Sequence, residues 1–158
     1  MAETGVALPI PYTAAEVSRI FEDMLAAFDF TVELQDLGIG AFSVFKRNRG
    51  NRHLTAVCIA LWRVALEKSF PNDAAKFFTH FLNTHPKFQG QGRAAGKLRD
   101  LVAEYNALIE EKKNTDFSTL AEKVVAALEI PAHNRPKFQL RLSLHIRARY
   151  ELIFEKLI

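Results

Sequence analysis

The sequence has little of what builds disulfide scaffolds or membrane spans. Its single cysteine, Cys58, cannot form an internal disulfide and cannot assemble a zinc cluster. The longest strongly apolar run, residues 54–66, is shorter than the roughly 20 residues of a membrane helix and is interrupted by Arg63. Residues 1–12 lack the basic start and apolar stretch of a signal peptide. We therefore expect a cytoplasmic protein with no membrane partner.

Glycine and proline are also scarce, with seven and six residues in a chain of 158. Most of them fall between stretches of helical apolar periodicity, which is typical of helices joined by short connections. A chain of this length usually forms one domain, and no repeat or long linker divides it. We predict a single all-α domain over residues 1–158, a compact bundle of five or six helices packed around residues 54–66.

Local signals predict where several helices begin and end. Thr13 and Glu16 have the spacing of a capping box at the start of the first helix. Asn72 or Asp73 is expected to open a helix that must end before Pro86. The remaining helices are predicted from apolar spacing within residues 98–109, 118–128 and 138–157.

Two segments allow a second interpretation. Residues 46–52 are predicted to form an exposed turn, and residues 41–58 could then form a small β-hairpin around it. Residues 138–147 alternate apolar and polar side chains as a strand does. A helix is favoured there, because one helical stripe runs continuously from Phe138 to Leu157. Leu140, Leu144 and Leu152 form a second stripe, which predicts a helix sandwiched between neighbours.

The residue types of common catalytic sites are not arranged as those sites require. The stretch 92–97 lacks the spacing of a phosphate-binding loop, and no HExxH occurs. Cys58 lies among apolar neighbours, which predicts a buried and unreactive thiol. We expect no metal, no cofactor and no enzymatic activity. A ligand pocket lined by Phe77, Phe81 and Phe88 is an alternative to their packing in the core.

Charge is distributed unevenly along the chain. Residues 1–45 carry one base and seven acids, a net charge of −6, whereas residues 46–158 carry 20 bases and 11 acids, a net charge of +9. Basic side chains gather in three segments, 46–52, 87–99 and 135–149. Arginine predominates in them, and its guanidinium suits bidentate contact with phosphate.

The basic segments lead to a functional hypothesis of nucleic-acid binding through the phosphate backbone. The residues predicted to make these contacts are Lys46, Arg47, Arg49, Arg52, Arg141, Arg147 and Arg149. Alternatively, the arginines of the last helix pair with acids of the first helix. A second hypothesis is a protein–protein adaptor, or a homo-oligomer, that uses the acidic N-terminal helix. Which hypothesis holds depends on whether the basic segments meet on one face.

Overall fold

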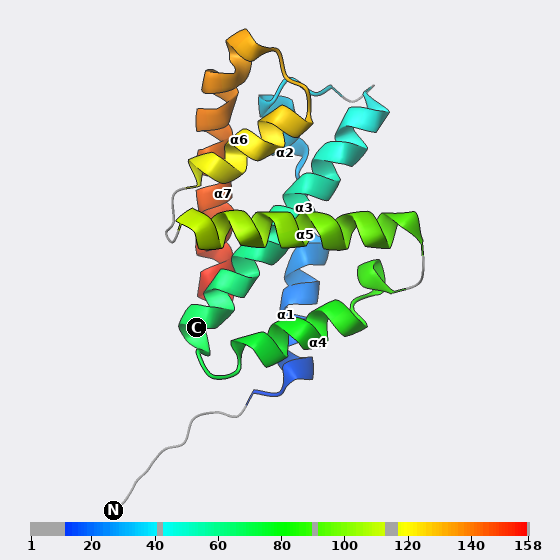
Figure 1. Cartoon of the computed structure of the whole chain (residues 1–158), viewed down its shortest axis with the longest axis vertical. Helices are drawn as coiled ribbons and strands as arrows, with labels where there is room; N and C mark the ends of the chain where they lie inside the picture. The colour runs from blue at the N-terminus through cyan, green and yellow to red at the C-terminus, as the bar shows by residue number, and fades with distance from the viewer. Residues whose placement is uncertain (1–11, 41–42, 90–91, 113–116, 158) are drawn as a thin grey trace, which may run out of the picture.

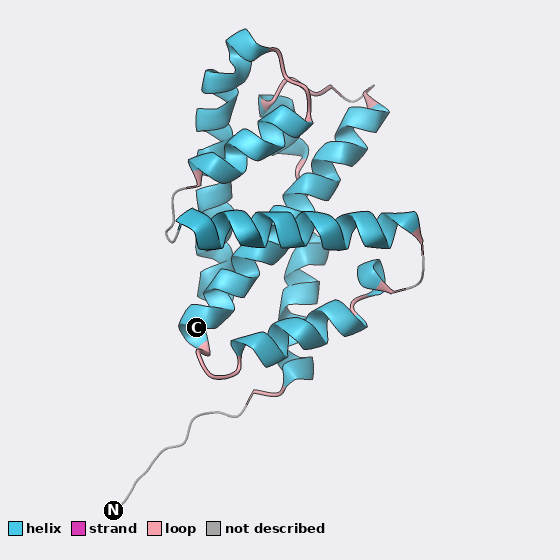
Figure 2. Ribbon diagram, in the orientation of Figure 1, coloured by secondary structure: helices cyan, strands magenta, loops and turns pink. Residues whose placement is uncertain are grey.

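The structure is a computed structural model of the chain, and it describes residues 12–40, 43–89, 92–112 and 117–157. Seven α-helices and two short 3-10 helices make up these residues, and no strand occurs among them (Figures 1 and 2). The predicted all-α class is therefore confirmed. The elements are α1 (Ala14–Ala27), α2 (Thr31–Asp36), α3 (Val44–Ser69), α4 (Ala74–Thr84), η1 (Pro86–Phe88), α5 (Arg93–Lys112), α6 (Ser118–Ala127), η2 (Ala132–Asn134) and α7 (Arg135–Lys156).

Helix α1 begins as the sequence predicts. The Thr13 Oγ1 atom accepts a hydrogen bond from the backbone N–H of Glu16 at 3.1 Å, and the Glu16 carboxylate accepts one from the N–H of Thr13, also at 3.1 Å. The two residues thus satisfy backbone donors that the first turn leaves without partners. Helix α4 ends at Thr84, before Pro86, as expected.

Helix α3 is the centre of the molecule. Its 26 residues run diagonally through Figure 1, and it packs against α4, α5, α6 and α7. The ring of Trp62 is fully buried, stacks on Phe21 of α1 at a centroid distance of 4.3 Å and meets Phe81 of α4 edge-on at 4.9 Å. The prediction that residues 54–66 form the core helix is confirmed.

The predicted turn at residues 46–52 is wrong, and so is the alternative hairpin within the described residues. These residues instead form the first turns of α3, which continues without a break from Val44. Gly50 lies inside this helix at a point where the Leu34 side chain of α2 packs closely against its backbone. A Cβ atom at Gly50 would lie 2.5 Å from the Cδ2 atom of Leu34. Packing between distant segments has overridden the low helix propensity of glycine.

The last segment is a helix, as favoured, but its surroundings differ from the prediction. Leu142, Ile146 and Ile153 of the first stripe are buried. The second stripe faces solvent, because no helix of the described ranges covers it: Leu140 is 64% exposed and Leu144 is 59% exposed. The expectation of a helix sandwiched between neighbours is therefore wrong.

The phenylalanines that were alternative pocket residues belong to the core. Phe77 and Phe88 are 3% and 2% exposed, and Phe81 is fully buried. The ring of Phe81 lies 6.0 Å from that of Phe88 and 5.2 Å from that of Phe21. Core packing accounts for these side chains.

Candidate nucleic-acid interface

The polar start of α3 presents one face to solvent. Asn48, Asn51, Arg52 and Thr55 are spaced at i, i+3, i+4 and i+7, and so they lie along one side of the helix. All four line an open hollow of about 320 Å³. This spacing is present in the sequence. It indicates a polar face only if residues 46–52 are helical, and the predicted turn at these residues is not compatible with such a face.

The opposite side of this hollow comes from η1 and the start of α5. Lys87 projects from η1, and Ala94 and Leu98 of α5 form the apolar part of the wall. The position of Lys87 is fixed locally, since its backbone N–H donates to Nδ1 of His85 at 3.1 Å. The buried ring of the next residue, Phe88, holds η1 against the core. Two basic segments that are distant in sequence, 46–52 and 87–99, thus meet here.

A second hollow of about 360 Å³ adjoins the first. Both contain Asn51, Thr55 and Lys87, so they form one continuous depression, which we call the α3 cleft. The far end of the cleft is formed by the end of α1 and the connection to α2. Its residues there are Leu25, Ala26, Phe28, Asp29 and Phe30.

The two ends of the α3 cleft differ in charge. Arg52 and Lys87 are the cations of the cleft, and neither forms an ion pair with another described residue. Asp29 is the carboxylate at the other end. Hydrogen bonds from the side chain and the backbone of Thr31 lower the pKa of Asp29, and the charges of Arg149 and Arg47 act in the same direction. Asp29 is therefore an anion at neutral pH, and an anionic ligand would favour the Arg52 end.

A histidine lies next to the cleft but faces inward. Nδ1 of His53 and the hydroxyl oxygen of Tyr105 are 2.8 Å apart, and both residues are buried. Burial, together with the charges of Lys123 and Arg52, lowers the pKa of His53 to about 4. Burial also raises the pKa of Tyr105. His53 is therefore neutral near pH 7 and adds no positive charge to the surface.

The other predicted bases of 46–52 take different positions. Lys46 is exposed on the first turn of α3, and Arg47 is half-buried. Arg49 points toward the end of α6, where its NH1 atom lies 3.4 Å from the carbonyl oxygen of Ala127 and 3.8 Å from the Glu129 carboxylate. Neither Lys46, Arg47 nor Arg49 lines the two hollows of the α3 cleft.

The segment 87–99 is divided in a similar way. Arg93 and Lys97 are exposed on the first two turns of α5. Arg99 donates to the carbonyl oxygens of Leu82 and Phe88 at 3.3 Å each, and its guanidinium lies 5.5 Å from the centre of the Phe88 ring. Arg99 therefore braces η1, whereas Lys87 is free to contact a ligand.

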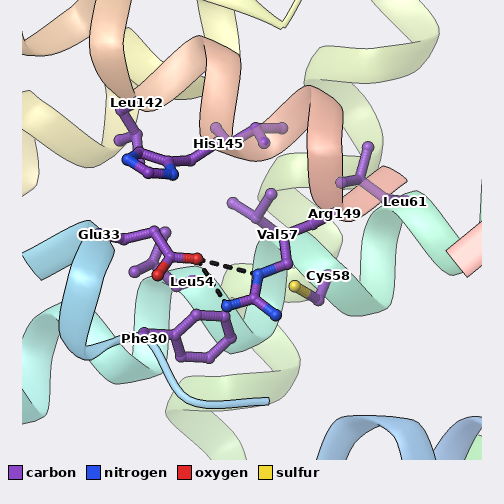
Figure 3. A pocket seen from close by; sticks show the side chains of 10 residues that line it. Phe30, Glu33, Leu54, Val57, Cys58, Leu61, Leu142, His145 and Arg149 are labelled. Carbon is purple, nitrogen blue, oxygen red and sulfur yellow. Dashed lines mark hydrogen bonds and ion pairs between the residues drawn. The ribbon is translucent and has the colours of Figure 1, made fainter. Parts of the chain in front are cut away.

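Arg149 is engaged within the protein (Figure 3). Its Nε and NH2 atoms lie 2.9 and 2.8 Å from Oε2 of Glu33, a residue of α2 that is only 4% exposed. NH2 also donates to the carbonyl oxygen of Asp29 at 2.9 Å, and the guanidinium stacks on the ring of Phe28 at 4.6 Å. The alternative that arginines of the last helix pair with acids of the first helix is therefore wrong in its partner, because Arg149 pairs with Glu33 of α2.

The cavity beside this ion pair is small. It has a volume of about 10 Å³ and is lined by α2, α3 and α7 side chains, including Cys58 and His145. That volume holds about one water molecule. Nε2 of His145 lies 2.7 Å from Oδ2 of Asp36, a second link between α7 and α2. We interpret this region as a structural joint between the acidic and basic parts of the chain.

The remaining predicted contacts, Arg141 and Arg147, are exposed on α7. Neither residue forms an ion pair with a described residue, and no α7 residue lines either hollow of the α3 cleft. The structure therefore brings two of the three basic segments together at the α3 cleft. Of the third segment, Arg149 contacts the cleft residues Phe28 and Asp29 but is paired with Glu33, whereas Arg141 and Arg147 do not line the cleft. Whether the predicted residues bind nucleic acid stays a prediction.

Reactive groups elsewhere in the described residues are few. Burial raises the pKa of the Cys58 thiol to about 12, so this cysteine is protonated and inert, as predicted. The described part of the chain contains no cluster of three His, Cys, Asp or Glu side chains able to hold a metal ion. None of its helices is both long enough and apolar enough to cross a bilayer.

The structure defines an all-α fold with an open surface depression, the α3 cleft, whose lining is partly polar and partly apolar. Searches against protein-family models, curated proteins and solved structures gave no match for this chain. Its functional interpretation therefore rests on the residues of the cleft.

Proposed function

We propose that this protein is a non-enzymatic binding module for single-stranded nucleic acid, which it holds by the phosphate backbone in the α3 cleft. The observation that carries the proposal is the meeting of Arg52 and Lys87 across one open hollow. Phosphate is bound by charged donors supported by neutral ones, and the cleft supplies both kinds. Asn48, Asn51 and Thr55 are the neutral donors between and beside the two cations.

The far end of the cleft favours a single strand over a duplex. Phe28 is half-buried there and has the guanidinium of Arg149 against one face of its ring, so the other face remains for a base, and bases of single strands stack on aromatic rings. The Asp29 carboxylate repels phosphate but accepts hydrogen bonds from base amino groups or a ribose 2′-hydroxyl. A strand is therefore oriented with a phosphate between Arg52 and Lys87 and a base near Phe28. We also propose that the protein acts in the cytoplasm, as the sequence predicts.

The contacts proposed here position a backbone and do not read a sequence. The cleft supplies few hydrogen-bond donors, and reading a sequence requires a set of donors and acceptors matched to the edges of the bases. We expect weak preference among sequences and a strong dependence of affinity on salt, because binding releases counterions. Arg141 and Arg147 contact the strand only if it extends to α7, and the experiment below tests Arg147 separately from the cleft.

The experiment is fluorescence anisotropy with short labelled RNA and DNA single strands and a duplex, at about 50 to 200 mM salt. We expect Arg52→Ala and Lys87→Ala each to weaken single-strand binding about fivefold to tenfold, since each removes a charged contact. Each should also lower the salt slope by about 0.7. Lys76→Ala is the matched control, because Lys76 is an exposed lysine of α4 outside the cleft.

The outcomes separate the cleft from the other basic surfaces. Arg147→Ala is expected to bind as the wild type does, and a loss equal to that of Lys87→Ala would move the interface to α7. No binding at the lowest salt, or equal affinity of the wild type and the Arg52→Ala/Lys87→Ala double variant, would overturn the proposal. Circular dichroism of each variant establishes that the fold is unchanged.

A further inference from the structure

The outward face of α7 carries an apolar stripe that no described residue covers. Its members recur at every fourth position: Leu140, Leu144, Ala148 and Leu152. Leu140 and Leu144 are 64% and 59% exposed, Leu152 is 37% exposed, and Ala148 is exposed as well. Residues spaced by four form a ridge along the helix, which is the surface that packs against another helix. The ridge extends over about 18 Å, given a rise of 1.5 Å per residue.

The charges beside this ridge are sorted along the helix. Lys137 and Arg141 lie in its N-terminal half, whereas Glu151 and Glu155 lie in its C-terminal half. All four are exposed, and none forms an ion pair with another described residue. The face is thus basic at one end, apolar in the middle and net acidic at the other end, where Lys156 is also exposed.

A face of this kind is complementary in charge to a second copy of itself that runs in the opposite direction. In an antiparallel pair of α7 helices, with the two-fold axis at the position of Ile146, Leu140 lies opposite Leu152 and Leu144 lies opposite Ala148. The same register sets Arg141 at the level of Glu151, and Lys137 at the level of Glu155, of the second copy, so that the basic end of each helix lies alongside the acidic end of the other. A two-fold interface repeats every contact, and four ion pairs of opposite charge then flank the ridge.

We infer that this protein forms a two-fold symmetric homodimer through the outward face of α7, with the two helices antiparallel. Ala148 is small enough for the Leu144 side chain of the second copy to pack against the helix backbone. The face of one helix is small beside the roughly 800 Å² per partner of a stable complex, so the dimer is weak, with a dissociation constant in the micromolar range. This interface is distinct from the α3 cleft, to which no α7 residue contributes.

Sedimentation equilibrium of the full chain at low salt tests the dimer. The wild type is expected to dimerise, and the association should weaken as salt rises because the flanking pairs are exposed. Leu144→Glu sets two carboxylates near the two-fold axis and should weaken association at least tenfold. Val32→Glu is the matched control, because Val32 is an equally exposed apolar residue (58%) on α2, and it should leave the dimer unchanged.

Charge reversal tests the antiparallel register. Arg141→Glu and Glu151→Arg should each weaken self-association about tenfold or more, since each replaces two attractive pairs with two repulsive ones. The double variant restores both pairs and should dimerise within about threefold of the wild type. The two single variants, when mixed, should form a heterodimer that neither forms alone.

Two results would overturn the inference. One is a wild-type chain that stays monomeric at high protein concentration and low salt. The other is a dimer whose dissociation constant is unchanged by Leu144→Glu and by both charge reversals. Thermal unfolding of each variant distinguishes weaker association from loss of folding, and the heterodimer test does not depend on the folding of Leu144→Glu.

Discussion

The ion pair between Glu33 and Arg149 joins α2 to α7, and its removal gives a prediction that can be worked from the structure. The Glu33 side chain is 5% exposed and that of Arg149 is 22% exposed. Arg149→Met keeps much of the apolar stem but leaves the Glu33 carboxylate buried without its partner. Breaking a buried pair on one side costs about 3 to 5 kcal/mol. Because the guanidinium is partly exposed, we expect the lower value, about 3 kcal/mol.

Chemical and thermal unfolding measure this cost. For a chain of this size, about 3 kcal/mol corresponds to a decrease in Tm of about 6 to 12 °C. Arg147→Met is the control, since Arg147 is exposed two residues away, and it should change the free energy of unfolding by less than about 0.5 kcal/mol.

A double variant tests the reasoning itself. Glu33→Met/Arg149→Met removes both charges, so it should be within about 1 kcal/mol of the wild type and recover most of the loss. If Arg149→Met costs less than about 1 kcal/mol, the buried carboxylate is not the source of the effect. If the double variant loses the sum of the two single losses, the two side chains are not coupled.

Three further predictions concern pH, packing and thiol chemistry. Since burial lowers the pKa of His53 from 6.5 to about 4, the unfolded chain binds a proton that the folded protein does not, and stability should fall by up to about 3 kcal/mol as pH drops between those values. Urea unfolding across this range should show a shallower fall for His53→Gln, and an equal fall would contradict the assignment. Gly96→Ala, whose added Cβ meets open space, should stabilise α5 by about 0.5 to 1 kcal/mol. Gly50→Ala should be about 1 to 3 kcal/mol less stable than Gly96→Ala in thermal unfolding, because its Cβ strikes Leu34; equal stabilities would show that α2 shifts freely. Cys58 should react with a thiol reagent at pH 8 only after denaturation, and rapid labelling of the native protein would contradict its burial.

The parts of the fold that the sequence predicts are those set by neighbouring residues. The capping box needs only Thr13 and Glu16, and the core stripe of α3 needs only apolar spacing. The start of α3 could not be predicted in this way, because Gly50 signals a turn locally, whereas the space for it in the helix is limited by Leu34, a residue of another element. The exposed leucines of α7 present the same problem, since apolar spacing does not reveal which side a neighbour covers.

The candidate site is predictable to a similar extent. Composition indicates the basic segments 46–52 and 87–99, and Arg52 and Lys87 from these segments lie in one cleft, although Lys87 is not among the residues predicted to make contacts. Composition alone could not separate them from Arg49, Arg99 and Arg149, which have partners within the chain. The spacing of Asn48, Asn51 and Thr55 would have indicated a polar helix face, but only a three-dimensional arrangement sets Lys87 opposite that face.

Helix α3 is polar where it forms the cleft and buried over the turns that follow, and this has a consequence for its motion. Amide protons of residues 54–66 can exchange with solvent only when the whole domain opens, because these turns are enclosed by other helices. The amides of residues 44–49 can exchange by fraying of the helix end alone. A ligand held by Asn51, Arg52 and Thr55 would therefore bind between the part of α3 that frays and the part that exchanges only on opening of the fold. The backbone there is already ordered, so binding costs only side-chain freedom.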